Sequence, residues 1–243
     1  MSRLVLHQPP GEGGLSYSPY CNKVRWALEL KGLAFDTVTT SAFKKHSRTG
    51  KLPVLVVDGE RVHDSTEILR RLGTLHPDPA LLPRDPRLAA QATLVEEWAD
   101  ESLCALVTYE RAFDPSARRR MVAGVLAFKG LPSFLGPVVA ARLRRSGSNR
   151  YGHLVPLGPD VVRQQLLRHL DVVNALAEGR SWLVGDSPTI ADVAVAACLH
   201  VAHIGRVAAV LSLIASRRHA AAWLEGFFER LGRPEAGRNP VAA

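Results

Sequence analysis

The chain has 243 residues, of which 47% are hydrophobic and 22% charged, a composition typical of a folded globular protein with one or two domains. The net charge is +8, yet no basic run alternates with aromatic residues, which argues against a nucleic-acid-binding protein. The three cysteines are odd in number and far apart, which argues against a secreted disulfide framework. With an N-terminus that lacks a long apolar core, they predict a cytoplasmic protein.

A short strand and a helix are predicted at the start of the chain. Residues 4–6 (LVL) form an apolar strand, and a loop rich in Gly and Pro follows. Ser18 is a good helix N-cap and Pro19 a good first helical residue. Apolar residues then recur at helical spacing up to Gly32, which is typical of a helix end.

The next elements predict an α/β domain with a mixed sheet. Strands are expected over residues 33–40 and 52–57, and a tight turn at 58–59 leads into a returning strand at 61–63. Residues 64–67 (DSTE) then open a second helix with the spacing of a capping box. The order strand, helix, strand, hairpin and helix is typical of a small α/β unit.

Pro53 lies at a position where a central strand would need a backbone N–H group. Pro53 begins an apolar strand, and proline cannot donate to a sheet ladder. Either an edge position or a cis peptide bond with the chain turned toward a ligand would resolve the conflict.

The domain organisation follows from a change of pattern. We expect a first domain over residues 1–76 and, because four prolines follow, a linker over 77–87. The pattern over 88–233 is helical without strand alternation, which predicts an all-helical second domain. Residues 234–243 are expected to form a disordered tail.

Three motifs carry a specific resemblance, in the order SPYCNKVRWAL (18–28), GKLPVLVVDG (50–59) and HDSTEIL (63–69). They resemble the N-terminal domain of the cytosolic glutathione transferase superfamily. The run WLVGDSPTIADVAVAACL (182–199) resembles the start of a buried helix in the same superfamily. The resemblance implies an α/β thioredoxin-like N-terminal domain followed by an all-α C-terminal domain.

The resemblance also implies a binding site for glutathione as co-substrate. Leu52, before a cis Pro53, would pair its backbone with the cysteinyl part of the tripeptide, as an exposed strand edge pairs with a peptide. Asp64 and Ser65 would hold the γ-glutamyl end, where the free N–H groups of a helix start favour a carboxylate. Lys51 would meet the glycyl carboxylate.

The resemblance to serine-type members assigns the catalytic role to Ser18, whose hydroxyl would donate a hydrogen bond to the glutathione thiolate. Lowering a thiol pKa by about two units takes about 2.7 kcal/mol, which a charge-assisted hydrogen bond and a helix N-terminus can supply. Ser16, Tyr17 and Cys21 remain open as the group next to the sulfur.

The predicted function is glutathione-dependent transfer, in which the activated thiolate attacks a small apolar electrophile. A non-catalytic, glutathione-transferase-like binding module or a membrane-associated scaffold is the alternative. The expected partners are the electrophile and a second copy in a homodimer, with no nucleic acid and no metal. Lys23 and Arg25 are expected to be surface charges.

The segment 118–158 departs from the family pattern, because it is apolar and flanked by arginines. It contains Lys129 and two prolines, and its uninterrupted apolar stretches are too short to cross a bilayer. We expect it to line an acceptor pocket or to pack against other parts of the protein, a dimer contact included. Weak contact with an anionic membrane is the alternative.

Overall fold

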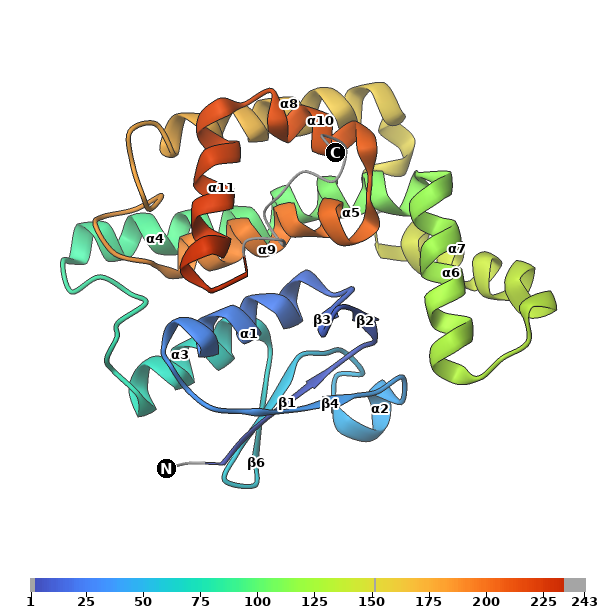
Figure 1. Cartoon of the computed structure of the whole chain (residues 1–243), viewed down its shortest axis with the longest axis horizontal. Helices are drawn as coiled ribbons and strands as arrows, with labels where there is room; N and C mark the ends of the chain where they lie inside the picture. Colours follow the sequence, from blue (N-terminus) through green and yellow to red (C-terminus); the bar gives the residue numbers. More distant parts are fainter. Residues whose placement is uncertain (1–2, 151, 234–243) are drawn as a thin grey trace.

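The fold is that of a computed structural model, which describes residues 3–150 and 152–233, with the backbone alone for 146–150 (Figure 1). The predicted tail at 234–243 lies outside the described residues.

Among the described residues, the first half of the chain forms a four-stranded mixed sheet covered by helices (Figure 1). In sheet order the strands are β4 (Asp36–Thr39), β1 (Leu4–Gln8), β5 (Val54–Val57) and β6 (Glu60–His63). β1 is parallel to β4 and antiparallel to β5, and β5 is antiparallel to β6. The helices of this half are α1 (Pro19–Leu30), α2 (Phe43–His46) and α3 (Ser65–Leu75).

Two local features differ from the prediction. The Gly- and Pro-rich loop contains a small hairpin of β2 (Gly11–Glu12) and β3 (Leu15–Ser16). Its turn residues Gly13 and Gly14 have φ angles of 58° and 78°, which a two-residue hairpin loop requires and glycine adopts without strain. The short helix α2 has no apolar periodicity, so the sequence pattern does not reveal it.

The second half contains only helices and turns within residues 86–150 and 152–233. Its first helices are α4 (Pro86–Trp98), a π-helical turn (Ala99–Leu103), α5 (Cys104–Phe113), α6 (Pro115–Lys129) and α7 (Gly136–Arg150). Its later helices are α8 (Pro159–Leu176), α9 (Ile190–Gly205), α10 (Ala208–Ala215) and α11 (Arg218–Arg230). α4 begins two residues earlier than the predicted helical domain, because Asp85 accepts a hydrogen bond from the Leu88 N–H at 2.9 Å.

The buried helix α9 organises the second half. Thr189 and Asp192 form a capping box at its start. The buried Asp192 carboxylate also accepts hydrogen bonds from Leu183 N at 2.7 Å and from Trp223 Nε1 at 3.2 Å. Burial raises the pKa of Asp192, and these hydrogen bonds oppose the rise. This carboxylate therefore serves the fold.

The two halves share one hydrophobic core through α1, which lies between the sheet and the helical half (Figure 1). Trp26 of α1 is fully buried and packs edge-on against Phe228 of α11 and His200 of α9, with ring centroids 4.9 and 5.3 Å apart. Because α1 is covered on both sides, the expectation that Lys23 and Arg25 are surface charges is wrong. Both are buried.

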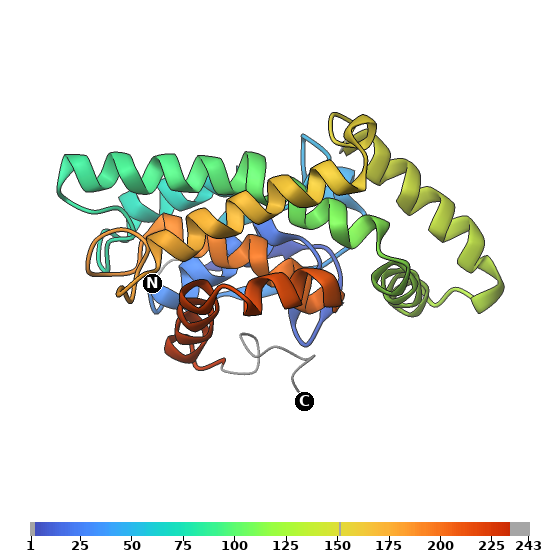
Figure 2. The same cartoon turned by 90° about the horizontal axis from the view of Figure 1, so that it is seen from above.

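The helices α6 and α7 pack against each other and extend beyond the rest of the helical half (Figures 1 and 2). Only a few residues of this hairpin, such as Ala117 and Leu126, are buried. In the part of the chain that the structure describes, no helix is long and apolar enough to cross a membrane.

Candidate functional site

The hydroxyl of Ser18 stands at the start of α1 without capping it. Ser18 is half-buried and has φ −92° and ψ 119°, as an N-cap residue has, but its side chain makes no capping hydrogen bond. The N-cap position is therefore as predicted. The hydroxyl does not cap the helix and instead interacts with the Cys21 thiol in the first turn.

Ser16 and Asn22 hold the loop before α1 in place. Ser16 is fully buried, and its hydroxyl donates to the Pro9 carbonyl at 3.1 Å and accepts from the Ser18 N–H at 3.1 Å. The Asn22 side chain donates to the Ser16 carbonyl and accepts from the Ser16 N–H, both at 2.9 Å. These bonds fix the position of Ser18 relative to the first turn of α1.

The thiol of Cys21 points into the protein. Cys21 is fully buried, and burial raises its pKa to about 12, although the hydroxyls of Ser18 and Ser16 act in the opposite direction. A thiol with such a pKa is protonated at neutral pH and is a poor nucleophile.

Tyr17 links the start of α1 to the helical half. Nη1 of Arg111, on α5, donates to the Tyr17 carbonyl at 2.7 Å. The phenol lies against α6, where a Cβ added at Gly124 would come within 3.0 Å of the Tyr17 hydroxyl oxygen. Burial, followed by the charge of Glu12, raises the pKa of Tyr17, and Arg111 opposes the shift. The sequence analysis missed Arg111, although an arginine within an apolar helix is a recognisable signal.

The Leu52–Pro53 peptide bond is cis. β5 lies between β1 and β6, so the alternative of an edge position for Pro53 is wrong. The pairing of β5 with β6 begins at Val54 and His63, which leaves the backbone of the half-buried Leu52 outside the ladder. Lys51 is exposed.

Asp64 caps α3 from an unusual backbone conformation. Its Oδ1 accepts from the N–H groups of Thr66 at 2.9 Å and Glu67 at 3.3 Å. Its φ of 73° costs a non-glycine residue about 1–3 kcal/mol, a kind of strain found most often at functional sites. Asp64 is exposed, whereas Ser65, the first residue of α3, is buried.

A buried polar cluster that the sequence analysis missed lies next to this helix start. Lys23 Nζ pairs with Glu96, with Asp100 Oδ2 at 2.6 Å and with Thr66 Oγ1 at 3.3 Å. The Thr66 hydroxyl donates to Glu96 Oε1 at 2.7 Å. We call Lys23, Thr66, Glu96 and Asp100 the polar cluster. It joins α1, α3, α4 and the π-helical turn, and its member Thr66 follows Asp64 and Ser65 in the chain.

The charges of the polar cluster shift one another's pKa values. Burial acts to lower the pKa of Lys23, but Asp100 and Glu96 outweigh it and the net shift is upward. Burial raises the pKa of Asp100 to about 6, although Lys23 opposes the rise. In the sequence, the burial of this cluster is indicated only by charged residues at helix positions that apolar residues surround.

The strand register places the ends of three strands next to one another. His7 pairs with Val54, and Val54 pairs with His63, so the end of β1, the start of β5 and the end of β6 lie side by side. The loop with Ser18 follows β1, Pro53 precedes β5, and α3 with Asp64 and Ser65 follows β6. The three strand ends next to these segments therefore lie at the same end of the sheet.

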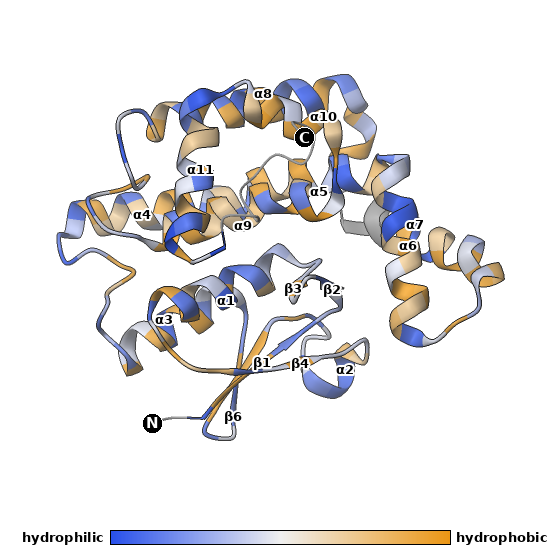
Figure 3. Ribbon diagram, in the orientation of Figure 1, coloured by the Kyte–Doolittle hydropathy of each residue, from blue (hydrophilic) through white to orange (hydrophobic). Residues whose placement is uncertain are grey.

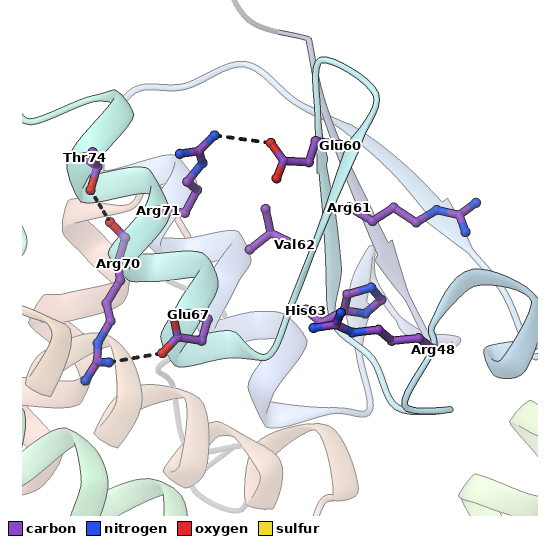
Figure 4. Close-up of a pocket in the computed structure, with 9 residues that line it drawn as sticks. All are labelled: Arg48, Glu60, Arg61, Val62, His63, Glu67, Arg70, Arg71 and Thr74. Atoms are coloured by element: carbon purple, nitrogen blue, oxygen red, sulfur yellow. Dashed lines mark hydrogen bonds and ion pairs between the residues drawn. The ribbon is translucent and has the colours of Figure 1, made fainter.

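A surface groove of about 460 Å³ lies elsewhere, between β6 and α3 (Figure 4). Charged side chains line most of it, and ion pairs join Arg71 to Glu60 at 3.3 Å and Arg70 to Glu67 at 3.1 Å. None of the predicted site residues lines this groove. Within residues 3–150 and 152–233, no group of three or more His, Cys, Asp or Glu is placed to hold a metal ion.

The architecture is a thioredoxin-like α/β domain followed by an all-helical domain, and this confirms the predicted fold class. The family model for the glutathione S-transferase N-terminal domain matches residues 17–75. The model for the glutathione S-transferase C-terminal domain matches residues 96–226. The chain belongs to the glutathione S-transferase family.

Individual relatives are distant. A probable glutathione S-transferase of Nicotiana tabacum is 30% identical over 101 residues, which cover 39% of this chain and 45% of the relative. A probable maleylacetoacetate isomerase of Caenorhabditis elegans is 35% identical over 81 residues, covering 30% of this chain and 38% of that one. The chain thus spans less than half the length of these curated relatives.

Solved structures match over more of the chain. A glutathione S-transferase from Methylobacterium radiotolerans, in complex with glutathione sulfonate, is 26% identical with a TM-score of 0.63. The match covers 96% of this chain and 94% of that one.

Proposed function

We propose that the protein is a glutathione-dependent transferase that activates the glutathione thiolate for attack on a small apolar electrophile. The observation that carries this proposal is that the end of β1, the start of β5 after the cis Leu52–Pro53 bond and the end of β6 before Asp64 lie side by side. We infer that Ser18, Leu52, Asp64 and Ser65 line one site there. The names of the curated relatives, and the glutathione sulfonate bound to a solved relative, support it.

Each end of the tripeptide meets a matching group in this proposal. The backbone of Leu52, which lies outside the ladder, pairs with the cysteinyl residue as a strand would. The first turn of α3 at Ser65 receives the γ-glutamyl carboxylate. Asp64 uses Oδ1 for both capping bonds, which leaves Oδ2 for the ligand's ammonium group. The exposed Lys51 meets the glycyl carboxylate.

The geometry favours Ser18 over its neighbours as the group next to the sulfur. Ser16 is buried and already makes two hydrogen bonds, and the Cys21 thiol is buried with a raised pKa. The Tyr17 phenol lies against Gly124 of α6. Ser18 is half-buried and does not use its hydroxyl as a cap, so it donates to the thiolate.

The electrophile enters from the side of the helical half. Tyr17 and Gly124 are in contact there, and Arg111 fixes the Tyr17 backbone. This contact forms the wall that faces the sulfur on the acceptor side. We also propose that the protein is a homodimer, as the family resemblance implies, and light scattering coupled to gel filtration tests this.

The experiment compares wild type with Ser18→Ala and with Ser41→Ala, an exposed serine outside the site. Glutathione binding is measured by calorimetry, and turnover is measured with 1-chloro-2,4-dinitrobenzene and a panel of other apolar electrophiles. Ser18→Ala should retain binding and lose turnover by about 100-fold, the equivalent of about 2.7 kcal/mol. Equal turnover in all three proteins would remove Ser18 from the mechanism.

A non-catalytic binding module remains the second candidate function. The projecting hairpin of α6 and α7 favours it, because a long exposed extension suits attachment more than conjugation (Figure 2). Glutathione binding by wild type without turnover of any electrophile on the panel would support this candidate.

A further inference from the structure

The hairpin of α6 and α7 concentrates the positive charge of the chain. We call residues 115–150 the arm. It contains eight Lys or Arg residues and no Asp or Glu, and the next acidic residue is Asp160. The net charge of the whole chain is +8, so the rest of the molecule is close to neutral. The arm therefore carries a charge equal to the net positive charge of the whole chain.

The tip of the arm exposes apolar side chains together. Phe134 is 76% exposed and Val138 65%, and Phe128 and Leu131 nearby are also exposed. Gly130 ends α6 with a φ of 61°, so the chain turns at the tip and returns as α7. Isolated exposed apolar residues are ordinary, but a group on one turn, flanked by cations, indicates an interaction surface. Figure 3 shows hydrophobic and hydrophilic residues next to one another along the arm.

The expected packing role holds only for the base of the arm. Gly124 contacts the Tyr17 phenol, and Ala117 and Leu126 are buried. The residues from Ala127 to Phe134 are all exposed. The tip is thus exposed to solvent in the described part of the chain.

We propose that the arm docks on the surface of an anionic membrane. Phe134 and Val138 enter the boundary between headgroups and acyl chains, while the arginines of α7, Arg142, Arg144 and Arg145, contact the anionic headgroups. The arm lies on the bilayer and does not cross it, consistent with the lack of a spanning helix among the described residues.

Charge and shape favour lipid over other occupants. A second copy that met this arm tip to tip would bring together two arms without a single acidic residue, and like charges across an interface are repulsive. An acidic protein would also be attracted by the cations of the arm. The exposed aromatic and aliphatic tip, however, needs an apolar phase as well as anions, and a bilayer surface provides both.

The experiment is co-sedimentation of the full chain with vesicles of phosphatidylcholine alone and with about 30% phosphatidylglycerol added. Wild type should bind only the anionic vesicles. It should be released when salt rises from about 0.1 M to about 1 M, because the Debye length falls from about 10 Å to about 3 Å. The triple variant R142Q/R144Q/R145Q should partition about 100-fold more weakly, whereas R142K/R144K/R145K should bind like wild type.

The tip and the controls are tested in the same assay. F134S/V138S should partition at least about tenfold more weakly. L94S removes an exposed leucine of α4, and R61Q/R70Q/R71Q removes the same charge from the first domain, so both should bind like wild type. Circular dichroism verifies that each variant is folded.

Three outcomes would overturn the inference. The first is sedimentation of wild type equally with neutral and anionic vesicles, or with neither. The second is a loss of binding in the R61Q/R70Q/R71Q control as large as in the arm variant, which would make the effect one of total charge. The third is separation of a dimer into monomers by F134S/V138S without a change in vesicle binding, which would assign the tip to contact between two copies.

Discussion

The end of the sheet and the arm differ in how their charged residues are used. In the polar cluster, next to the start of α3, the charges are buried and paired. In the arm the charges are of one sign, and most of those whose side chains are described are exposed. A fixed site suits one small ligand held in one orientation, whereas a one-sign exposed surface suits an extended anionic partner.

The largest effect is expected from Lys23→Met in the polar cluster. This change leaves the buried carboxylates of Glu96 and Asp100 without their cation and should lower the free energy of unfolding by about 3–5 kcal/mol. Urea denaturation measures it. Phe134→Ser at the arm tip is the matched comparison and should change stability by less than about 0.5 kcal/mol. An equal loss of unfolding free energy in Lys23→Met and Phe134→Ser would contradict the difference between the buried cluster and the exposed arm.

The next effect is a pH dependence that originates in the polar cluster. The pKa of Asp100 is about 6 in the folded protein against 3.8 for the ordinary group, so the native state holds its proton more tightly. This contribution to stability is fully present below pH 3.8 and is lost as the pH rises through 6. The contribution of Asp100 should be on the order of 3 kcal/mol.

The midpoint of urea unfolding, followed from pH 4 to pH 7, tests this sign. The urea midpoint of wild type should fall as the pH rises through this range. In Asp100→Asn the part of that fall which comes from Asp100 should disappear. A wild type and a variant with parallel curves would show that Asp100 does not titrate in this window.

Asp64→Asn separates ligand binding from stability. Asparagine keeps an oxygen for the capping bonds to Thr66 and Glu67 and tolerates a positive φ, so stability should change little. The loss of the negative charge should weaken glutathione binding about tenfold, or about 1.4 kcal/mol. Calorimetry measures this, and an affinity equal to that of wild type would show that Asp64 only caps α3.

Gly124→Ala changes the place where the arm lies against Tyr17, next to the start of α1. The added methyl group would stand 3.0 Å from the Tyr17 hydroxyl oxygen, so the ring must move slightly. The KM for a bulky electrophile should change a few-fold, while the KM for glutathione stays constant. Ala123→Val, on an exposed position of α6, is the control. A change in the glutathione KM instead would place Tyr17 in the glutathione site.

The sequence predicted those parts of the site that depend on local chemistry. A helix start at Ser18, a capping aspartate at Asp64 and a proline that a strand cannot use are each visible within a few residues. The register places the strand ends next to these segments side by side. The fold class was predictable for the same reason, because the order of elements and three short motifs define it.

The sequence could not predict what distant segments impose. Lys23 appeared to be a surface residue because its burial depends on Glu96 and Asp100, more than 70 positions away. Arg111 reaches Tyr17 across 94 positions. The apolar, basic pattern of the arm predicted a pocket or packing role, with membrane contact as the alternative. Only the projection of α6 and α7 from the body separates its packed base from its exposed tip (Figure 2).

The ionisation of bound glutathione tests the role of Ser18 most directly. The ultraviolet absorbance of the thiolate is followed against pH in wild type and in Ser18→Ala, each saturated with glutathione. We expect the bound thiol of wild type to ionise about two units below the free value of about 8.5, and that of Ser18→Ala to return close to the free value. Identical titration curves in the two proteins would contradict the account.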